Sequence, residues 1–139
     1  MSDIETLIKK SEKYFGAVLG GSYVFVRSGA LSIDDIKDVD LCIDDKTRYK
    51  GIVNYLSDEG YEPDTNAVDR YGNVSSCVSL FKDHSINIHV CFKEKVSNSV
   101  WYANPIDILS CKMRRGTQRD WEHVEKIAKS GVYIKKGGK

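Results

Sequence analysis

The segment DVDLCI, from Asp38 to Ile43, alternates strictly between two kinds of side chain. In an extended strand this alternation places the apolar residues on one face and Asp38, Asp40 and Cys42 on the other. The two carboxylates then lie about 7 Å apart along one strand. A chain with this pattern must bury the first face under other elements and leave the carboxylates to water or to a cation.

Composition indicates one globular domain. The chain has 139 residues, of which 41% are hydrophobic and 29% charged, with a formal net charge of +1. This length suffices for a single buried core, and the charge balance gives no overall attraction to nucleic acid or membrane. We expect one domain over residues 1–134 and a flexible tail over residues 135–139.

Several sequence features favour a cytoplasmic protein. No apolar run approaches the roughly 20 residues that span a bilayer, and the first residues, MSDIETLIKK, do not form a signal peptide. The four cysteines are scattered without a C-x-x-C pair, which favours reduced, buried thiols over a disulfide framework. Cys91 and His89 are weak candidates for a zinc site because no second ligand pair accompanies them.

Helical and extended segments both follow from residue spacing. Apolar residues recur at helical intervals in segments that start near residues 3, 47, 105 and 118. NVSSCVSLFK and SINIHVCFK predict two strands joined by a tight turn. In the second of these strands Asn87, His89 and Cys91 share the polar face. YVFV, which starts at Tyr23, favours a strand by propensity alone. In the last helix we expect Trp121, among others, to be buried.

The carboxylates and the preceding turn together point to phosphate chemistry. Asp38 and Asp40 would repel each other unless a cation lay between them, and their oxygens suit Mg²⁺, which commonly keeps water and substrate phosphates as further ligands. Gly21 and Ser22 lie in a Gly-Gly-Ser turn that offers unobstructed N–H groups and a hydroxyl to a phosphate. Either fragment alone is more often an ordinary solvated loop or strand edge; their ordered combination indicates phosphoryl or nucleotidyl transfer.

This combination resembles the signature of the DNA polymerase β-like nucleotidyltransferase superfamily, in which Gly-Ser is followed by Asp-x-Asp between apolar residues. The segment NPIDILSCKMRRGTQRDWEHVEKI is also similar to the C-terminal segment of small nucleotidyltransferases of the abortive-infection toxin and antitoxin type. The matching residues there are Lys112, Arg119 and Asp120. The resemblance covers residues 15–45 and 100–128.

The resemblance implies an α+β fold with a mixed β-sheet flanked by helices. It implies that Gly21 and Ser22 contact the phosphates of a nucleoside triphosphate and that Asp38 and Asp40 bind Mg²⁺. It also implies a helix directly after the Gly-Ser turn, where propensity favours a strand, and we side with the helix. Lys112 would offset the charge of the triphosphate.

The chain departs from the family at one position. The family carries a third carboxylate on a neighbouring strand, which binds metal and helps to deprotonate the attacking hydroxyl. Here the corresponding strand offers Asn87 and His89. Asn87 can ligate Mg²⁺ but cannot take a proton, whereas a neutral His89 can act as a base near pH 7. Without the third carboxylate, a second metal ion is doubtful.

Two functions therefore remain open. The first is Mg²⁺-dependent transfer of a nucleoside monophosphate from a triphosphate to a hydroxyl of a protein, an RNA end or a small molecule. The second is a catalytically inactive member of the fold that binds a partner protein as an inhibitor, antitoxin or regulator. Binding of nucleic acid by the basic cluster around Arg114 and Arg115 has thinner support, because basic residues at a helix end are commonly solvated.

Overall fold

The computed structural model describes residues 3–63, 77–93, 100–102 and 104–132. The expected tail lies outside these residues. Described elements are α1 (Asp3–Phe15), β1 (Val18–Gly20), α2 (Tyr23–Arg27), η1 (Ile33–Asp35), β2 (Asp38–Ile43), α3 (Lys46–Asp58), β3 (Glu62–Pro63), β4 (Cys77–Phe81), β5 (Asn87–Phe92), η4 (Val100–Tyr102), α4 (Pro105–Arg115) and α5 (Gln118–Ser130). In this part of the chain helices and strands alternate up to α3, and three strands and then the last helices follow.

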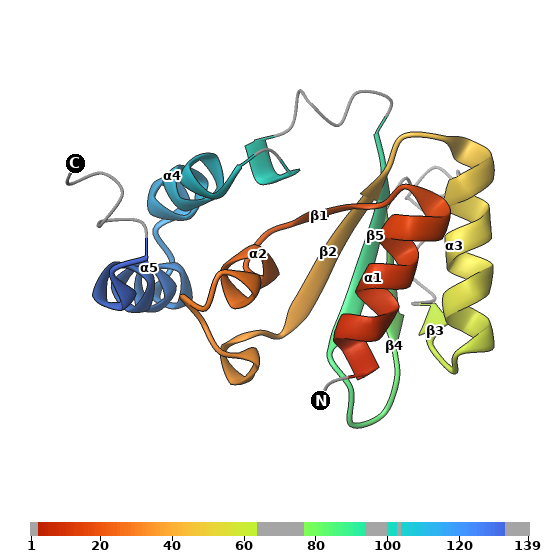
Figure 1. Ribbon diagram of the computed structural model, residues 1–139, viewed down its shortest axis with the longest axis horizontal. Helices are drawn as coiled ribbons and strands as arrows, with labels where there is room; N and C mark the ends of the chain where they lie inside the picture. The colour runs from red at the N-terminus through yellow and green to blue at the C-terminus, as the bar shows by residue number, and fades with distance from the viewer. Residues whose placement is uncertain (1–2, 64–76, 94–99, 103, 133–139) are drawn as a thin grey trace.

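The strands form one mixed sheet in the order β1-β2-β5-β4-β3. β2 lies parallel to β5, and all the other neighbouring pairs are antiparallel. The predicted hairpin is confirmed as the antiparallel pair β4 and β5. The chain is therefore an α+β protein with a mixed sheet and flanking helices, as expected (Figure 1).

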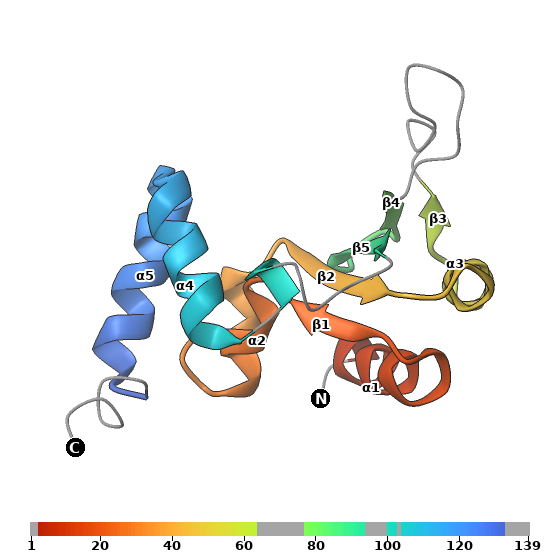
Figure 2. The ribbon, with the colours of Figure 1, turned by 90° about the horizontal axis from the view of Figure 1, so that it is seen from above.

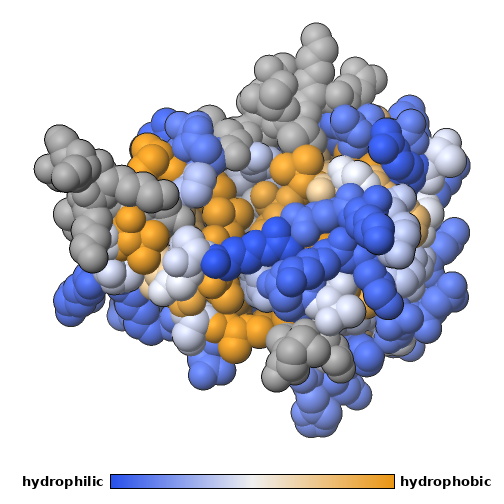
Figure 3. All heavy atoms as spheres, in the orientation of Figure 1, coloured by the Kyte–Doolittle hydropathy of each residue, from blue (hydrophilic) through white to orange (hydrophobic). Residues whose placement is uncertain are grey.

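The apolar face of the sheet is covered by α1 and α3, which lie together on one side of it (Figure 2). The predicted alternation in β2 is confirmed, since Val39, Leu41 and Ile43 are at most 1% exposed. Ile88 and Val90 of β5 continue this buried layer. Because one face of β2 is fixed in the core, its carboxylates must project from the opposite face. In Figure 3 hydrophilic side chains cover much of the outer surface of α1 and α3, whereas hydrophobic residues are exposed nearer to α2 and α4.

The segment YVFV is helical, as the family resemblance implied and against its strand propensity. It forms the short helix α2, in which Tyr23 and Phe25 are buried. Tyr23 donates a hydrogen bond to Glu5 of α1 (2.8 Å), and Arg27 forms ion pairs with Glu5 and Glu12. Tertiary contacts of this kind override a weak intrinsic preference for strand.

The last two helices pack against each other beside α2 (Figures 1 and 2). α4 starts at Pro105, as predicted, with Asn104 as its cap, and it ends before Gly116. The burial predicted for α5 is partly wrong: Trp121 is 46% exposed, while Asp120 and His123 are buried with Ile127.

Among the described residues, none of the helices has the length and apolar character that crossing a membrane requires.

Candidate functional site

Two aligned strands bring the predicted polar residues together. In the parallel pairing of β2 with β5, Asp38 is aligned with Asn87 and Asp40 with His89. The side chain of Asp38 is 39% exposed and that of Asp40 is 18% exposed. One carboxylate thus faces solvent while the other lies deeper against the protein.

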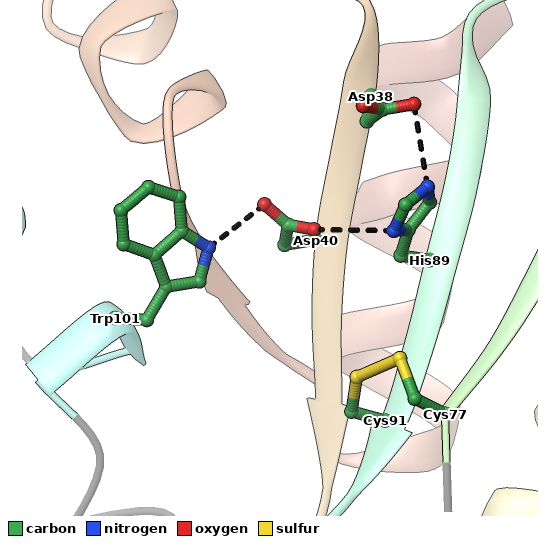
Figure 4. The surroundings of a disulfide bond; sticks show 6 residues. All are labelled: Asp38, Asp40, Cys77, His89, Cys91 and Trp101. Carbon is green, nitrogen blue, oxygen red and sulfur yellow. Dashed lines mark hydrogen bonds and ion pairs between the residues drawn. A yellow bond between two sulfur atoms is a disulfide. The ribbon is translucent and has the colours of Figure 1, made fainter. Parts of the chain in front are cut away.

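His89 lies between the two carboxylates (Figure 4). Its Nε2 is 3.3 Å from Oδ1 of Asp38, and its Nδ1 is 3.9 Å from Oδ1 of Asp40. The strand expected to carry a third carboxylate therefore places an imidazole ring in contact with both aspartates. A protonated ring would supply positive charge there, and a neutral ring could accept a proton.

Asp40 is further held by an aromatic residue from η4. The indole Nε1 of Trp101 donates a hydrogen bond to Oδ2 of Asp40 at 2.9 Å (Figure 4). Burial raises the pKa of Asp40 from its ordinary value, and this hydrogen bond opposes the rise. Trp101 therefore holds the Asp40 carboxylate in position.

The Gly-Gly-Ser turn lies directly against Asp40. Gly21 has φ +66°, and a Cβ placed there would lie 2.3 Å from Oδ2 of Asp40 and 3.0 Å from Nε1 of Trp101. The Gly21 N–H donates to the Trp101 carbonyl at 3.1 Å. Glycine is required here both for its backbone conformation and for the close approach of the turn to the carboxylate.

Ser22 is in contact with the lysine that the sequence singled out. Lys112 is only 1% exposed, and its Nζ lies 2.5 Å from Oγ of Ser22 and 3.0 Å from Nδ1 of His123. Burial lowers the pKa of Lys112 to about 8, although the Asp120 carboxylate 3.9 Å away opposes this effect. His123 was not predicted from the sequence.

Asp120 and Arg119 hold α5 in place. Asp120 forms a capping box with Thr117 and an ion pair with Arg115 at 2.6 Å. Burial opposes ionisation of Asp120, but its hydrogen bonds from Arg115 and Thr117 lower its pKa to about 2. Arg119 donates to the carbonyl of Asp35 at 2.8 Å, which ties α5 to the segment before β2.

Most of these residues line one cavity of about 290 Å³, but the predicted site residues Gly21 and Asn87 are not among its lining residues. Its sheet side carries Asp38, Asp40 and His89, and its helix side carries Lys112 and three further charged groups of α4 and α5. A larger cavity of about 510 Å³ lies between α1, α3 and the β4–β5 turn, but no pair of aspartates lines it. Opposed carboxylates and cations make the smaller cavity the candidate site.

The carboxylates of this cavity are ligands of the kind that Mg²⁺ uses. Among the described residues, no group of three or more His, Cys, Asp or Glu side chains is arranged to hold a metal ion. Mg²⁺ commonly uses one or two carboxylates and completes its shell with water and substrate phosphates. Asp38 and Asp40 fit that requirement for one ion, which would compete with the His89 ring for their oxygens.

The expectation of reduced thiols is wrong for two of the four cysteines. Cys77 and Cys91 form a disulfide between β4 and β5 (Figure 4). They are directly opposite each other in the antiparallel register, with Cα atoms 4.0 Å apart. Strand pairing, which the spacing of the cysteines does not reveal, brings them together. Cys42 and Cys111 carry free thiols, and Cys91 is not available as a zinc ligand.

No protein-family model matches the chain, and no curated protein is similar enough to count as a match.

Proposed function

We propose that this chain is a small protein of the nucleotidyltransferase type that binds a nucleoside triphosphate with Mg²⁺ and transfers the nucleoside monophosphate to an acceptor hydroxyl. One observation carries the proposal: a single cavity places two carboxylates of one strand opposite a buried lysine and two exposed arginines, with a glycine-serine turn packed against the deeper carboxylate. Phosphoryl transfer requires carboxylates that hold a metal cation and positively charged side chains that bind the phosphates.

Each group has a role in this proposal. Asp38 and Asp40 would hold one magnesium ion, whose charge would withdraw electron density from the α-phosphorus. Lys112 and Arg115, on the opposite side of the cavity, offset the charge of the triphosphate. The acceptor hydroxyl attacks the α-phosphorus, pyrophosphate leaves, and His89 or water takes the proton of the acceptor.

A label-transfer assay tests this proposal. The full chain is incubated with Mg²⁺ and each α-labelled nucleoside triphosphate, with casein, short RNA and small alcohols offered as acceptors. Pyrophosphate release and acceptor labelling are then measured. Asp38→Asn should lower both by about tenfold or more, because it removes a carboxylate charge from the metal position. Asp44→Asn is the matched control, since Asp44 is an exposed aspartate just beyond β2 whose contact is with Arg48.

A second candidate, an inactive relative that binds a partner protein, is favoured by His89 in place of the third carboxylate. The same assay separates the two candidates when His89→Asp is included. In an inactive relative, wild-type chain gives no transfer, and His89→Asp restores the three carboxylates and raises transfer above the blank. Transfer by wild-type chain that Asp38→Asn abolishes contradicts the inactive reading. Absence of transfer by the wild-type chain contradicts the proposed enzyme, whether or not His89→Asp transfers.

A further inference from the structure

The position of Ser22 suits a nucleophile as well as a phosphate ligand. Its hydroxyl lines the 290 Å³ cavity together with Asp38 and Asp40, so a substrate held by the aspartates would lie beside it. Nζ of Lys112 donates a hydrogen bond to Oγ of Ser22 at 2.5 Å, which is shorter than the usual range for such a bond. A serine hydroxyl is a weak nucleophile at its ordinary pKa and requires an adjacent base to react.

Lys112 has the surroundings of such a base. Its side chain is 1% exposed, and burial disfavours the ammonium form, so that its pKa falls to about 8. A substantial fraction of the side chain is then a neutral amine near pH 8.

His123 orients the amine. Its Nε2 is 3.0 Å from the carbonyl oxygen of Asp35. A carbonyl only accepts, so this nitrogen carries the proton and Nδ1 offers a lone pair. Lys112 therefore donates one N–H to Nδ1 of His123, at 3.0 Å. Nζ of Lys112 also donates to Oγ of Ser22 in the structure, and Oγ lies 3.3 Å from Nδ1 of His123. In the neutral amine the nitrogen lone pair can turn toward Oγ and accept the Ser22 proton.

We infer that Ser22 is a Lys112-activated nucleophile that accepts the nucleoside monophosphate itself, so that the chain modifies its own cavity. Oγ of Ser22 forms a bond to the α-phosphorus of the bound triphosphate, and the bond between that phosphorus and the bridging oxygen breaks. Pyrophosphate leaves with the electron pair, the hydroxyl proton passes to Nζ of Lys112, and a phosphodiester links Ser22 to the nucleoside. The nucleotidyl step rests on the proposed function; the activation of Ser22 does not.

The first experiment uses a phosphonofluoridate probe without nucleotide or metal. Attack on this probe forms an Oγ–phosphorus bond and releases fluoride, so it reports nucleophilicity alone. We expect one adduct by intact mass, mapped to the peptide that contains Ser22 and absent from Ser22→Ala. Ser110→Ala, which changes an exposed serine of α4, should label at the wild-type rate. The labelling rate should rise with pH and level off above about 8, the pKa of Lys112.

The pH profile has a single expected origin. The groups that face Lys112 from the neighbouring elements are Asp40, Arg115, Arg119, Asp120 and His123. Asp120 has a pKa of about 2, burial lowers the pKa of His123 from its ordinary value, and arginines stay charged throughout. Burial raises the pKa of Asp40 from its ordinary value, so the variant completes the assignment: a rise centred near pH 8 that Lys112→Arg abolishes belongs to Lys112.

Lys112→Arg separates a base from a positive charge. The guanidinium keeps the charge but cannot become neutral in this pH range. We expect Lys112→Arg to slow labelling by about tenfold or more, because general-base catalysis typically contributes at least that much. Lys112→Met should do the same, and circular dichroism establishes that each variant is folded before its rate is compared.

The second experiment supplies nucleoside triphosphate and Mg²⁺. The expected result is a mass gain of one nucleoside monophosphate on the peptide that contains Ser22. Triphosphate binding without any adduct in either experiment overturns the inference and leaves the proposed function standing. A Lys112-dependent probe adduct without triphosphate binding supports the activation of Ser22 and overturns the nucleotidyl step. Equal probe labelling of wild type and Lys112→Arg overturns the role of Lys112.

Discussion

Replacement of Gly21 by alanine is expected to destabilise the fold by about 3 kcal/mol, the sum of backbone strain and steric overlap. Gly21 has φ +66°, and its new Cβ would lie 2.3 Å from Oδ2 of Asp40. Atoms do not approach that closely, so the turn or the carboxylate must move. The partly buried hydrogen bond between Trp101 and Asp40 would be disturbed with it.

Gly29→Ala is the matched control. Gly29 also has a positive φ, +84°, but a Cβ there would have no neighbour within 4 Å. It carries only the backbone strain of roughly 1–2 kcal/mol. Urea unfolding of both variants measures the difference between them. Equal losses of unfolding free energy would show that the turn does not press against Asp40 and would contradict the packing on which the site rests.

The stability of the fold should also depend on pH through Lys112. Its pKa falls from 10.5 to about 8 on folding because burial disfavours the charge. Between these two values the unfolded chain binds more protons than the folded chain, so the free energy of unfolding rises with pH there. Below about pH 8 the folded state bears the full cost of the buried ammonium.

Lys112→Met isolates this effect from the other titrating groups. Burial raises the pKa of Cys42 to about 11 and that of Tyr23 to about 12, and both would lower stability at high pH in either chain. Relative to Lys112→Met, wild type should gain about 2 kcal/mol of unfolding free energy between pH 7 and pH 9.5. Lys129→Met, at a side chain 75% exposed, should give a flat difference. A flat difference for Lys112→Met would contradict a buried, partly neutral lysine.

The carboxylate face was predictable because strand periodicity is a local property. The alternation from Asp38 to Ile43 was enough to place Asp38 and Asp40 on one side of β2, and the structure confirms this placement. The alignment of His89 with Asp40 was not predictable, because it depends on the register between β2 and β5. That register is fixed by the burial of both strands, which involves residues far apart in the sequence.

On the helix side of the cavity, the hydrophobic pattern does not predict which side chains of α5 are buried. Burial of Trp121 was expected from the helical spacing of apolar residues, yet α5 turns Asp120 and His123 inward instead. Each buried polar group finds a partner on another element, Arg115 for Asp120 and Lys112 for His123. Burying a polar group costs much less free energy when it has a hydrogen-bond partner. A single sequence does not reveal which residue that partner is.

The central claim is that Mg²⁺ and a nucleoside triphosphate bind together at Asp38 and Asp40. Its most direct test is calorimetric titration of the full chain with the four triphosphates, with and without Mg²⁺, for wild type and for Asp38→Ala/Asp40→Ala, after circular dichroism has established that both are folded. The account predicts that at least one triphosphate binds wild type, more tightly with Mg²⁺, and that the double variant loses this Mg²⁺ dependence. Failure of every triphosphate to bind wild type, or equal Mg²⁺ dependence in both chains, would contradict the claim.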